Sequence, residues 1–598
     1  MPRLLDLRRP SLTLAALAIL AGCATATGHT AVTGGVAPPQ ANHASEATSQ
    51  KALLARADSA WDAGAYLLAT DLYEAAVTRD SSNSHAIFRL ATLRAWDNRS
   101  EEGVRLYRRY VALEPRDTEG RLALARALAW GGKYSSALAI YDSVITQDRT
   151  YRDAVLGRAQ TLAWAGRLGE ALGTYKRWVA DHPTDREASL EYARALSWNG
   201  QLDEAETMYT QLAKTGDANA QKGLARVIAW RGELNRSEAA WRQVLDIRPN
   251  DAEALTGLAQ ILSWQGRQSD AETALQLALR ANPAYGDARA LLRWVQADLR
   301  PSVTVTGLGT NDSDHNRATT FLLDYMRPGL WNTTVGGRYT GRSANFAAID
   351  SRTDGVDVFA RWQPGTWQLR ADAGASRHSS TLVVSPAKPQ TIGSGALHAS
   401  GSVGRALTVG FGASRVPFDE TALLIANGVV SSEYSVEAAL ALPARFSLSG
   451  GASRARLTGG TRENTRDAFS STLRWTHNRR WSLAVGARQF GYDTTSSDGY
   501  FAPRKYTLAE VSGRGRVGGA LGWNADADLG LGRQSIEFFG FSAGSRLAER
   551  AALSAGYRFD PSREITFSGG YANVAGPGQT GGSEYRMYSF ALRARLGL

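Results

Sequence analysis

Arginine and aspartate side chains at alternating positions are the groups in this sequence best suited to chemistry. Along residues 367–375, Arg370 and Asp372 alternate with Leu369 and Ala371. Side chains two residues apart in a β-strand share a face, so one surface would be charged and the other apolar. The same alternation predicts one polar face that carries Arg361, Arg370, Asp372, Arg474, Arg488, Asp526, Arg558 and Arg593, together with Asp357, Asn524, Asp528 and Arg595.

Two roles are compatible with this polar face. Guanidinium and carboxylate groups form strong charge-assisted pairs, so they can neutralise one another and brace a small barrel from within. Alternatively, the same groups can form a weakly basic track for an acidic or neutral polysaccharide. The sequence leaves both roles open.

Two motifs that suggest catalysis are better explained as structure. The segment 513–518 matches GxGxxG, but it precedes a strand pattern rather than a helix, so it predicts a turn and not a dinucleotide site. His378 lies beside Ser379 and Ser380, yet no partner acid is evident. The other candidate histidines, His315, His398 and His477, are scattered. We therefore expect no enzyme, no metal site and no cofactor.

Bulk composition limits the other classes of function. At 598 residues the chain should hold at least two domains. Its single cysteine excludes an intramolecular disulfide framework and a cysteine-cluster metal site. The net charge of +11 suits nucleic acid, anionic lipid or an acidic polymer. Because no nucleic-acid motif is present and the N-terminus indicates secretion, we do not expect a nucleic-acid partner.

The N-terminus has the pattern of a secretory signal. Arg3, Arg8 and Arg9 precede the apolar run 12–21, which is shorter than the roughly 20 residues of a membrane-spanning helix. The run ends in Leu-Ala-Gly-Cys23, which resembles the bacterial lipobox and implies a lipidated Cys23 after a signal peptide of residues 1–23. Cleavage after residues 24–26 without lipidation is the alternative. Residues 24–50 are rich in small and polar residues and predict a flexible linker.

Residues 51–300 contain an internal repeat. Its clearest marker is a ladder of tryptophans spaced by 34 residues, with one interval of 32: Trp96, Trp130, Trp164, Trp198, Trp230 and Trp264. An alanine precedes each tryptophan by five residues, and a glycine follows five of them by two. A 34-residue period with these offsets resembles the tetratricopeptide repeat (TPR), which implies about seven helix pairs and a terminal helix.

The position of the tryptophan, at the end of the first helix, departs from the usual repeat. The segment 124–132 resembles repeats in periplasmic scaffolds attached to exopolysaccharide-export barrels. The ladder either packs between repeats or exposes some rings that stack on sugars. An α-solenoid of this kind binds peptides, proteins or polymers over an extended surface.

Residues 301–598 alternate short strand-like segments with connections that are short, then long, in turn. The short connections lie at 327–330, 363–366, 404–405, 442–445, 477–480, 514–518 and 560–563. The long ones lie near 310–317, 343–353, 378–391, 417–430, 458–465, 494–503, 531–546 and 575–583. This rhythm predicts a transmembrane antiparallel β-barrel of about 16 strands, with 14 as the alternative, and short turns on the periplasmic side.

Aromatic residues support the barrel and its orientation. Five tryptophans flank the short turns, as in an interfacial girdle: Trp331, Trp362, Trp367, Trp475 and Trp481. Five aromatic residues toward the long loops suggest a second girdle: Tyr339, Tyr492, Tyr500, Phe501 and Tyr585. The last strand alternates apolar residues and ends in Leu598. It resembles the C-terminal signal read by the barrel-assembly machinery, although that signal commonly ends in Phe.

The whole sequence is therefore expected to be an α+β multidomain protein, a TPR solenoid followed by a barrel in the bacterial outer membrane. It resembles the YaiO-type outer-membrane barrel family and the larger export subunits for cellulose and poly-N-acetylglucosamine. The resemblance implies export or assembly of a cell-surface polysaccharide, with the TPR domain in the periplasm binding the polymer or a protein partner. The alternative is a structural outer-membrane protein whose TPR domain recruits periplasmic proteins.

Overall fold

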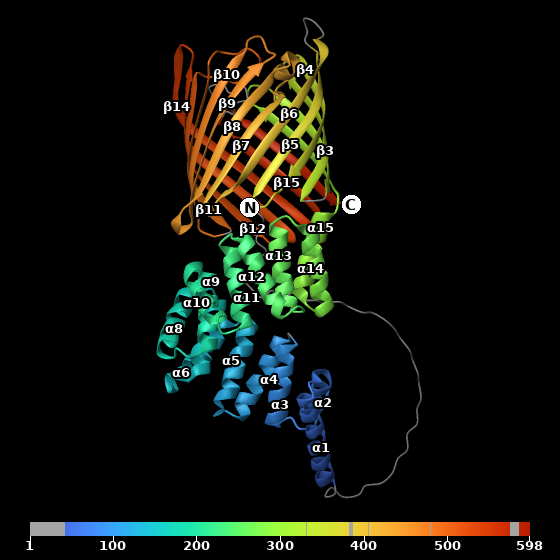
Figure 1. The fold of residues 1–598 in the computed structure, drawn as a ribbon, viewed down its shortest axis with the longest axis vertical. Helices are drawn as coiled ribbons and strands as arrows, with labels where there is room; N and C mark the ends of the chain where they lie inside the picture. Colours follow the sequence, from blue (N-terminus) through green and yellow to red (C-terminus); the bar gives the residue numbers. More distant parts are fainter. Residues whose placement is uncertain are drawn as a thin grey trace, which may run out of the picture. The chain divides into compact units, whose positions relative to one another are not determined.

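The computed structural model describes residues 42–97, 99–329, 332–381, 387–404, 406–478, 480–574 and 585–598. The chain divides into two compact units, Met1–Trp230 and Arg231–Leu598. In the described residues the first unit is helical, and the second contains the last helices and all the strands (Figure 1). The predicted signal peptide, Cys23 and most of the predicted linker lie outside the described residues.

Helices follow one another through the described residues up to Leu299. Their bounds are α1 (Asn42–Asp62), α2 (Tyr66–Arg79), α3 (Ser84–Trp96), α4 (Ser100–Leu113), α5 (Thr118–Trp130), α6 (Tyr134–Gln147), α7 (Arg152–Trp164), α8 (Leu168–Asp181), α9 (Arg186–Asn199), α10 (Leu202–Ala213), α11 (Ala218–Trp230), α12 (Leu234–Ile247), α13 (Ala252–Trp264), α14 (Gln268–Ala281) and α15 (Gly286–Leu299). Seven helix pairs and a final helix match the predicted repeat count. Helix α1 begins inside the segment assigned to the linker. None of the described helices has the length and apolar character needed to cross a membrane.

The repeat glycines and aspartates set the ends of the helices. Gly132, Gly166 and Gly200 adopt φ values of 73°, 80° and 85° directly after the first helix of their repeats, a conformation that side chains with a Cβ disfavour. The carboxylate of Asp117 accepts hydrogen bonds from the backbone N–H groups of Glu119 and Gly120 and so caps α5. These turns fix the 34-residue period that the sequence shows.

In the repeats before α14, a large aromatic residue from the second helix fills the space between helices, and in α14 the buried Leu275 takes this place. Tyr141 and Trp241 are almost fully buried. Each packs against a glycine, because a Cβ added at Gly157 would lie 2.6 Å from the Tyr141 ring. At Gly257 it would overlap the Trp241 ring in the same way. The helices can approach this closely only where the chain has no side chain.

Strands begin directly after the helical array. Their bounds are β1 (Ser302–Asp312), β2 (Arg317–Pro328), β3 (Thr333–Phe346), β4 (Ile349–Trp362), β5 (Trp367–Ser380), β6 (Ala387–Val403), β7 (Leu407–Pro417), β8 (Val430–Ala441), β9 (Phe446–Thr458), β10 (Asn464–Thr476), β11 (Trp481–Tyr492), β12 (Lys505–Gly518), β13 (Gly522–Phe538), β14 (Phe541–Asp560), β15 (Arg563–Ala572) and β16 (Met587–Gly597). A short helix, α16 (Ala422–Asn427), lies between β7 and β8, and a 3-10 turn, η1 (Pro443–Arg445), precedes β9.

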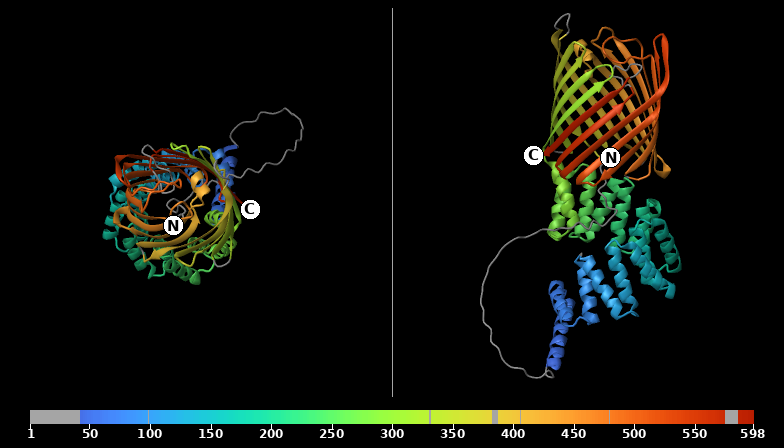
Figure 2. Two further views of the ribbon diagram at one scale, coloured as in Figure 1. Left: turned by 90° about the horizontal axis from the view of Figure 1, so that it is seen from above. Right: turned by 180° about the vertical axis from the view of Figure 1, so that it is seen from behind.

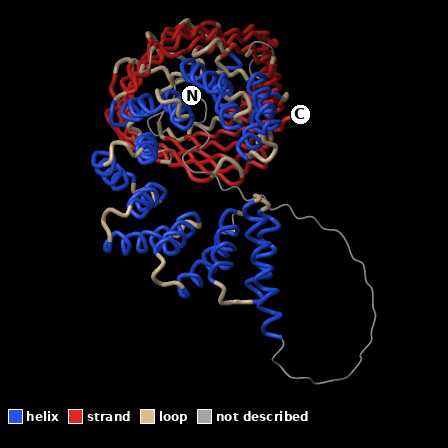
Figure 3. Tube along the Cα trace, turned by 60° about the horizontal axis from the view of Figure 1, so that its bottom comes forward, coloured by secondary structure: helices blue, strands red, loops and turns tan. Residues whose placement is uncertain are grey.

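The strands form one closed antiparallel barrel in which each pairs with its neighbours in sequence and β1 pairs with β16 (Figure 3). The predicted strand count of 16 is confirmed. Large apolar side chains such as Val358, Leu483 and Phe590 are exposed on the outer face. A closed barrel with an apolar outer face is consistent with an outer-membrane protein.

Two connections are tighter than the sequence predicts. The long loops expected at 343–353 and 531–546 are absent, because β3 and β4 pair up to Phe346 and Ile349, and β13 and β14 pair up to Phe538 and Phe541. Ala347 and Gly540 adopt positive φ in the resulting turns. The polar residues that indicated loops are therefore part of extended strand pairs, a difference that pattern alone does not reveal.

The tryptophans at the short turns lie as predicted where the structure describes them. Trp362, Trp475 and Trp481 are exposed on the outer face, and Trp523, next to the turn after β12, joins them. Trp331 lies outside the described residues. An outward ring of indoles at one end is typical of a membrane interface.

Candidate functional site in the barrel interior

Strand register assigns each side chain to the interior or to the outer face. In the strand register, Arg338 of β3 lies opposite Asp357 of β4, and Arg488 of β11 lies opposite Leu508 of β12. The same alternation, followed around the barrel, places all the arginines, aspartates and Asn524 of the predicted polar face on the interior face. The outer face carries the apolar residues of the same strands.

Many interior charges are neutralised by one another. Arg370 lies 2.5 Å from Asp372 on β5, Arg516 lies 2.6 Å from Asp526, and Arg338 lies 2.6 Å from Asp324. Arg550 contacts both Glu510 at 2.9 Å and Asp528 at 2.8 Å. Arg558 pairs with Glu564. Except for Arg370–Asp372, these pairs join different strands, so part of the polar face acts as the bracing network that the sequence suggests.

Three other interior arginines, Arg361, Arg474 and Arg593, differ from these pairs. Arg361 lies directly opposite Arg370 in the β4–β5 register, and Arg370 is already paired with Asp372. Within the described chain, Arg361, Arg474 and Arg593 form no ion pair, and the Nε of Arg595 is buried without a hydrogen-bond partner. Arg474 donates only to the Ser482 hydroxyl, at 3.1 Å. Arg488 stacks over the Tyr506 ring at 5.6 Å.

The segment 418–429, which contains α16, crosses the long-loop end of the interior. On one side, Arg342 of β3 contacts the Asp419 carboxylate at 2.9 Å, and Ser351 of β4 donates to the Ala422 carbonyl at 2.8 Å. On the other side, Thr421 donates to the Gly499 carbonyl between β11 and β12 at 3.0 Å. The segment therefore crosses the lumen, inside the ring of strands seen along the barrel in Figure 2 (left).

An apolar cluster seals the space beside this segment. Leu424 packs in one cluster with Phe490, Tyr492, Tyr500 and Tyr506. The prediction of a second aromatic girdle is wrong for Tyr492, Tyr500, Phe501 and Tyr585, which are buried in this cluster. Tyr492 ends β11, whereas Tyr500, Phe501 and Tyr585 lie in the connections next to the strands. The sequence signal for a segment inside the barrel was the apolar run Ala422–Asn427, in a region expected to be an exposed loop.

His378 is buried in the barrel interior, where it is 2% exposed. Its Nε2 lies 2.9 Å from the Ser376 hydroxyl, so its neighbour is Ser376 and not Ser379, which faces outward. Its Nδ1 has no hydrogen-bond partner within the described chain. The predicted motif neighbours are thus separated by strand alternation. His315, His398 and His477 come from different loops and strands.

A polar pocket of about 650 Å³ lies at the short-turn end of the second unit. Strand ends contribute Arg361, Gln363, Gln368 and Arg595, and helices α14 and α15 with the following turn contribute Gln268, Asp298 and Arg300. Surrounding protein raises the pKa of the Asp298 carboxyl above its usual range, and the charge of Arg595 opposes this rise. The pocket offers amide, hydroxyl, carboxylate and guanidinium groups beside apolar surface.

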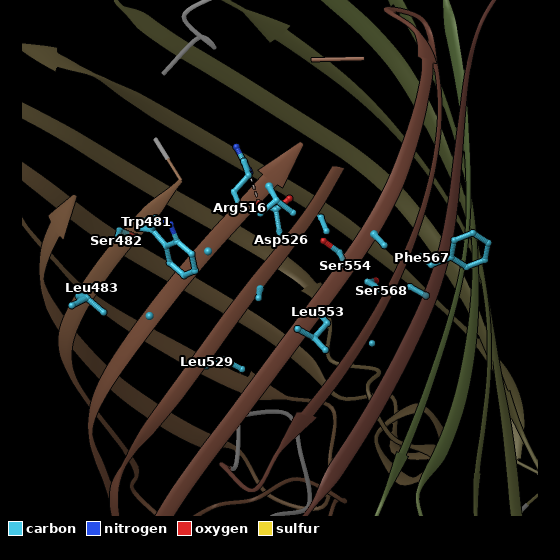
Figure 4. A pocket seen from close by; sticks show the side chains of 18 of the residues that line it. Trp481, Ser482, Leu483, Arg516, Asp526, Leu529, Leu553, Ser554, Phe567 and Ser568 are labelled. Carbon is cyan, nitrogen blue, oxygen red and sulfur yellow. Dashed lines mark hydrogen bonds and ion pairs between the residues drawn. The ribbon is translucent and has the colours of Figure 1, made fainter. Parts of the chain in front are cut away.

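A larger hollow of about 1270 Å³ lies on the outer face of β11–β16 (Figure 4). Trp481, Leu483, Leu553 and Phe567 surround a floor of small residues that includes Gly513. Figure 4 also shows the Arg516–Asp526 pair on the interior side of this wall. Because its lining is almost wholly apolar, this hollow suits the hydrocarbon of a membrane rather than a polar ligand.

The tryptophan ladder of the helical array is graded in exposure. Trp96 is 54% exposed and Trp130 is 40% exposed, whereas Trp264 is 8% exposed. Trp164, Trp198 and Trp230 are intermediate. Trp96 stacks on Trp61 with ring centroids 5.3 Å apart, and Arg89 covers Trp61 at 4.3 Å. The ladder thus changes from exposed rings near the start to a buried ring in α13.

Comparisons with known proteins identify the type of repeat in the helical array. Two tetratricopeptide-repeat family models match the chain, one over residues 131–188, 165–227 and 231–295 and the other over residues 88–152. No curated protein shows significant sequence similarity to the chain.

Solved structures match the chain at low identity and low TM-score. A tetratricopeptide repeat protein from Parabacteroides merdae is 16% identical with a TM-score of 0.37, covering 42% of this chain and 99% of that one. A bacterial polysaccharide outer membrane secretin is 10% identical with a TM-score of 0.39, covering 50% of this chain and 99% of that one. PilW, a type IV pilus biogenesis factor, is 20% identical with a TM-score of 0.31, covering 35% of this chain and 98% of that one. The matches of the two family models show that the helical array is built from tetratricopeptide repeats, and a closed barrel of 16 strands follows it.

Proposed function

We propose that this protein is an outer-membrane conduit for export or assembly of a cell-surface polysaccharide. The barrel provides the passage, and the TPR array lies in the periplasm, where it binds the polymer or a synthase-associated protein. The protein acts by binding and conduction, without covalent chemistry. It would be related to the YaiO-type barrels, with lipidated Cys23 as an additional membrane attachment.

The observation that carries this proposal is the polar lining of the lumen between the short turns and the apolar cluster of the long-loop end. It runs from the pocket at the short turns along interior arginines, aspartates and hydroxyls. A barrel that serves only as an anchor needs no uncompensated interior charge, since burying one without a partner is costly. A polymer with many hydroxyl groups can exchange hydrogen bonds along such a wall as it moves.

The closure of the long-loop end supports a second candidate function. If the segment 418–429 never leaves the lumen, the barrel is a filled anchor and the TPR array recruits periplasmic proteins. The bonds of Asp419, Thr421 and Ala422 to the wall hold the segment in place. In the first function the segment moves out of the lumen when polymer arrives. In the second function the segment stays in the lumen permanently.

Removing the gene and analysing surface glycans distinguishes these functions. The conduit predicts loss of one polysaccharide from the surface and its accumulation in the periplasm, with recovery when the full chain is restored. Restoring only the barrel, residues 301–598, tests the role of the TPR array in delivery. An unchanged glycan profile in the deletion strain would favour the filled anchor.

A further inference from the structure

The short-turn mouth of the barrel carries an excess of positive charge. We name Arg361, Arg474, Arg593 and Arg595 the mouth arginines. They lie within the last few residues of β4, β10 and β16, where those strands reach the short turns. These three strands are spread around the closed barrel, so the charges surround the opening rather than cluster on one wall.

The environment of Arg361 shows why this charge requires an explanation. Its direct cross-strand neighbour is Arg370, and like charges in that relation repel. Arg370 donates hydrogen bonds from both its Nε and its Nη2 to the Asp372 carboxylate. Arg361 thus lies beside a completed ion pair with no acid of its own in the described chain.

The other side of the mouth repeats this arrangement. Glu564 lies opposite Arg595 in the β15–β16 register, but its carboxylate pairs with Arg558. Arg595 retains a buried Nε without a hydrogen-bond partner in the described chain. On the helical side of the pocket, Asp270 pairs with Arg267. Asp298 forms no ion pair with Arg595 within the described residues, although the charge of Arg595 acts to lower the pKa of the Asp298 carboxyl.

The polar pocket joins these two arginines. Arg361 and Arg595 line it together with the amides of Gln363 and Gln368 and the hydroxyl of Ser302. Guanidinium groups bind carboxylates with paired hydrogen bonds. Amide and hydroxyl side chains exchange hydrogen bonds with sugar hydroxyls, and the volume of about 650 Å³ is ordinary for a small-molecule site.

These observations specify the class of polymer. We propose that the pocket and the mouth arginines bind the carboxylates of an acidic polysaccharide built from uronic acid residues, and that they select this polymer at the entrance of the barrel. This inference rests on the proposed conduit function. A neutral polymer would leave the guanidinium groups unsatisfied, and a cationic polymer would be repelled.

Binding by the full-length protein in detergent tests the proposal. Isothermal titration calorimetry would compare a galacturonate hexamer, a neutral glucose hexamer and a glucosamine hexamer, with inorganic phosphate as a simple anion. We expect measurable binding of the galacturonate hexamer alone. The double variant Arg361→Gln/Arg595→Gln should weaken it by about tenfold or more, since two charge-assisted contacts are lost.

Arg516→Gln is the matched control, because Arg516 is an interior arginine near the short turns but is paired with Asp526. Heat-modifiable mobility on gels reports whether each barrel is folded.

Equal weakening of galacturonate binding in Arg516→Gln would show a general charge effect and overturn the site. Equal binding of phosphate would show a simple anion site and overturn it too. Binding of the neutral hexamer as tight as that of galacturonate would overturn the acidic specificity while leaving the conduit function standing. Absence of binding by every glycan, with an unchanged surface glycan in the deletion strain, would contradict both.

Discussion

Ser351 on β4 donates a hydrogen bond of 2.8 Å to the carbonyl oxygen of Ala422, which lies at the start of the helix inside the barrel. Both groups are buried. The bond ties a segment that connects β7 and β8 to a strand on another part of the wall. Together with the Arg342–Asp419 pair, it holds residues 418–429 across the long-loop end of the lumen.

Loosening these anchors should open the barrel. In planar bilayers the double variant Arg342→Gln/Ser351→Ala should show more frequent and longer ion-conducting openings than the wild type, because it removes one ion pair and one hydrogen bond that hold the segment. Arg352→Gln is the control, since Arg352 is exposed and pairs with Asp354 outside the lumen. Identical conductance in all three proteins would mean that the segment closes the barrel by other contacts or that the barrel is closed elsewhere.

The closing segment also shows where sequence reasoning stops. The strand count, the alternation of Arg370 and Asp372, and the tryptophans at the short turns could be predicted, because each follows from a local period of two or from a turn signal. The burial of Tyr492 at the end of β11 and of Tyr500 in the following loop could not. Both are buried against residues 418–429, whose position inside the barrel is set by contacts with distant strands.

Close packing at Gly157 gives a test of the TPR fold. Gly157→Ala should destabilise the helical array by about 1–3 kcal/mol, because the new methyl group overlaps the buried Tyr141 ring. Gly173→Ala is the matched control within a neighbouring helix, where a Cβ meets nothing within 4 Å. It should stabilise the array by about 0.5–1 kcal/mol. Thermal unfolding followed at 222 nm measures both. Equal effects at the two sites would contradict the packing.

Asp185 makes the stability of the array depend on pH. The Arg152 guanidinium beside it, with hydrogen bonds from the Ala188 N–H and the Trp178 indole, holds the pKa of the Asp185 carboxyl well below its usual range. Because the folded pKa lies below the unfolded value of about 3.9, the stabilisation is complete above that value and is lost as the pH falls toward the folded pKa.

Two variants separate the charge of Asp185 from its capping role. Asp185→Asn keeps a side-chain acceptor for the α9 N-terminus and removes the charge that Arg152 contacts at 2.8 Å. It should lower the melting temperature at pH 7 and reduce the difference between pH 7 and pH 3. Asp185→Ala should lose about 1 kcal/mol more, the value of a cap. A melting temperature of Asp185→Asn that changes with pH as much as that of the wild type would assign the pH dependence to other groups.

The graded exposure of the tryptophan ladder separates packing from binding. Trp264→Ala should destabilise the array by about 3–5 kcal/mol, as expected for a buried tryptophan. Trp130→Ala should cost much less, since its ring is 40% exposed. If the exposed rings contact the polymer, Trp130→Ala will weaken binding of a hexasaccharide without a comparable loss of stability. Unchanged hexasaccharide binding by a folded Trp130→Ala protein would assign the exposed rings to repeat structure alone.

Passage of a glycan through the barrel is the central claim, and efflux from liposomes measures it most directly. Liposomes would be loaded with a labelled galacturonate hexamer and with a labelled dextran too large to pass, and they would contain either the wild type or Arg342→Gln/Ser351→Ala. We predict release of the hexamer but not of the dextran, faster from the variant than from the wild type. Retention of the hexamer in liposomes whose variant barrels conduct ions would contradict the conduit.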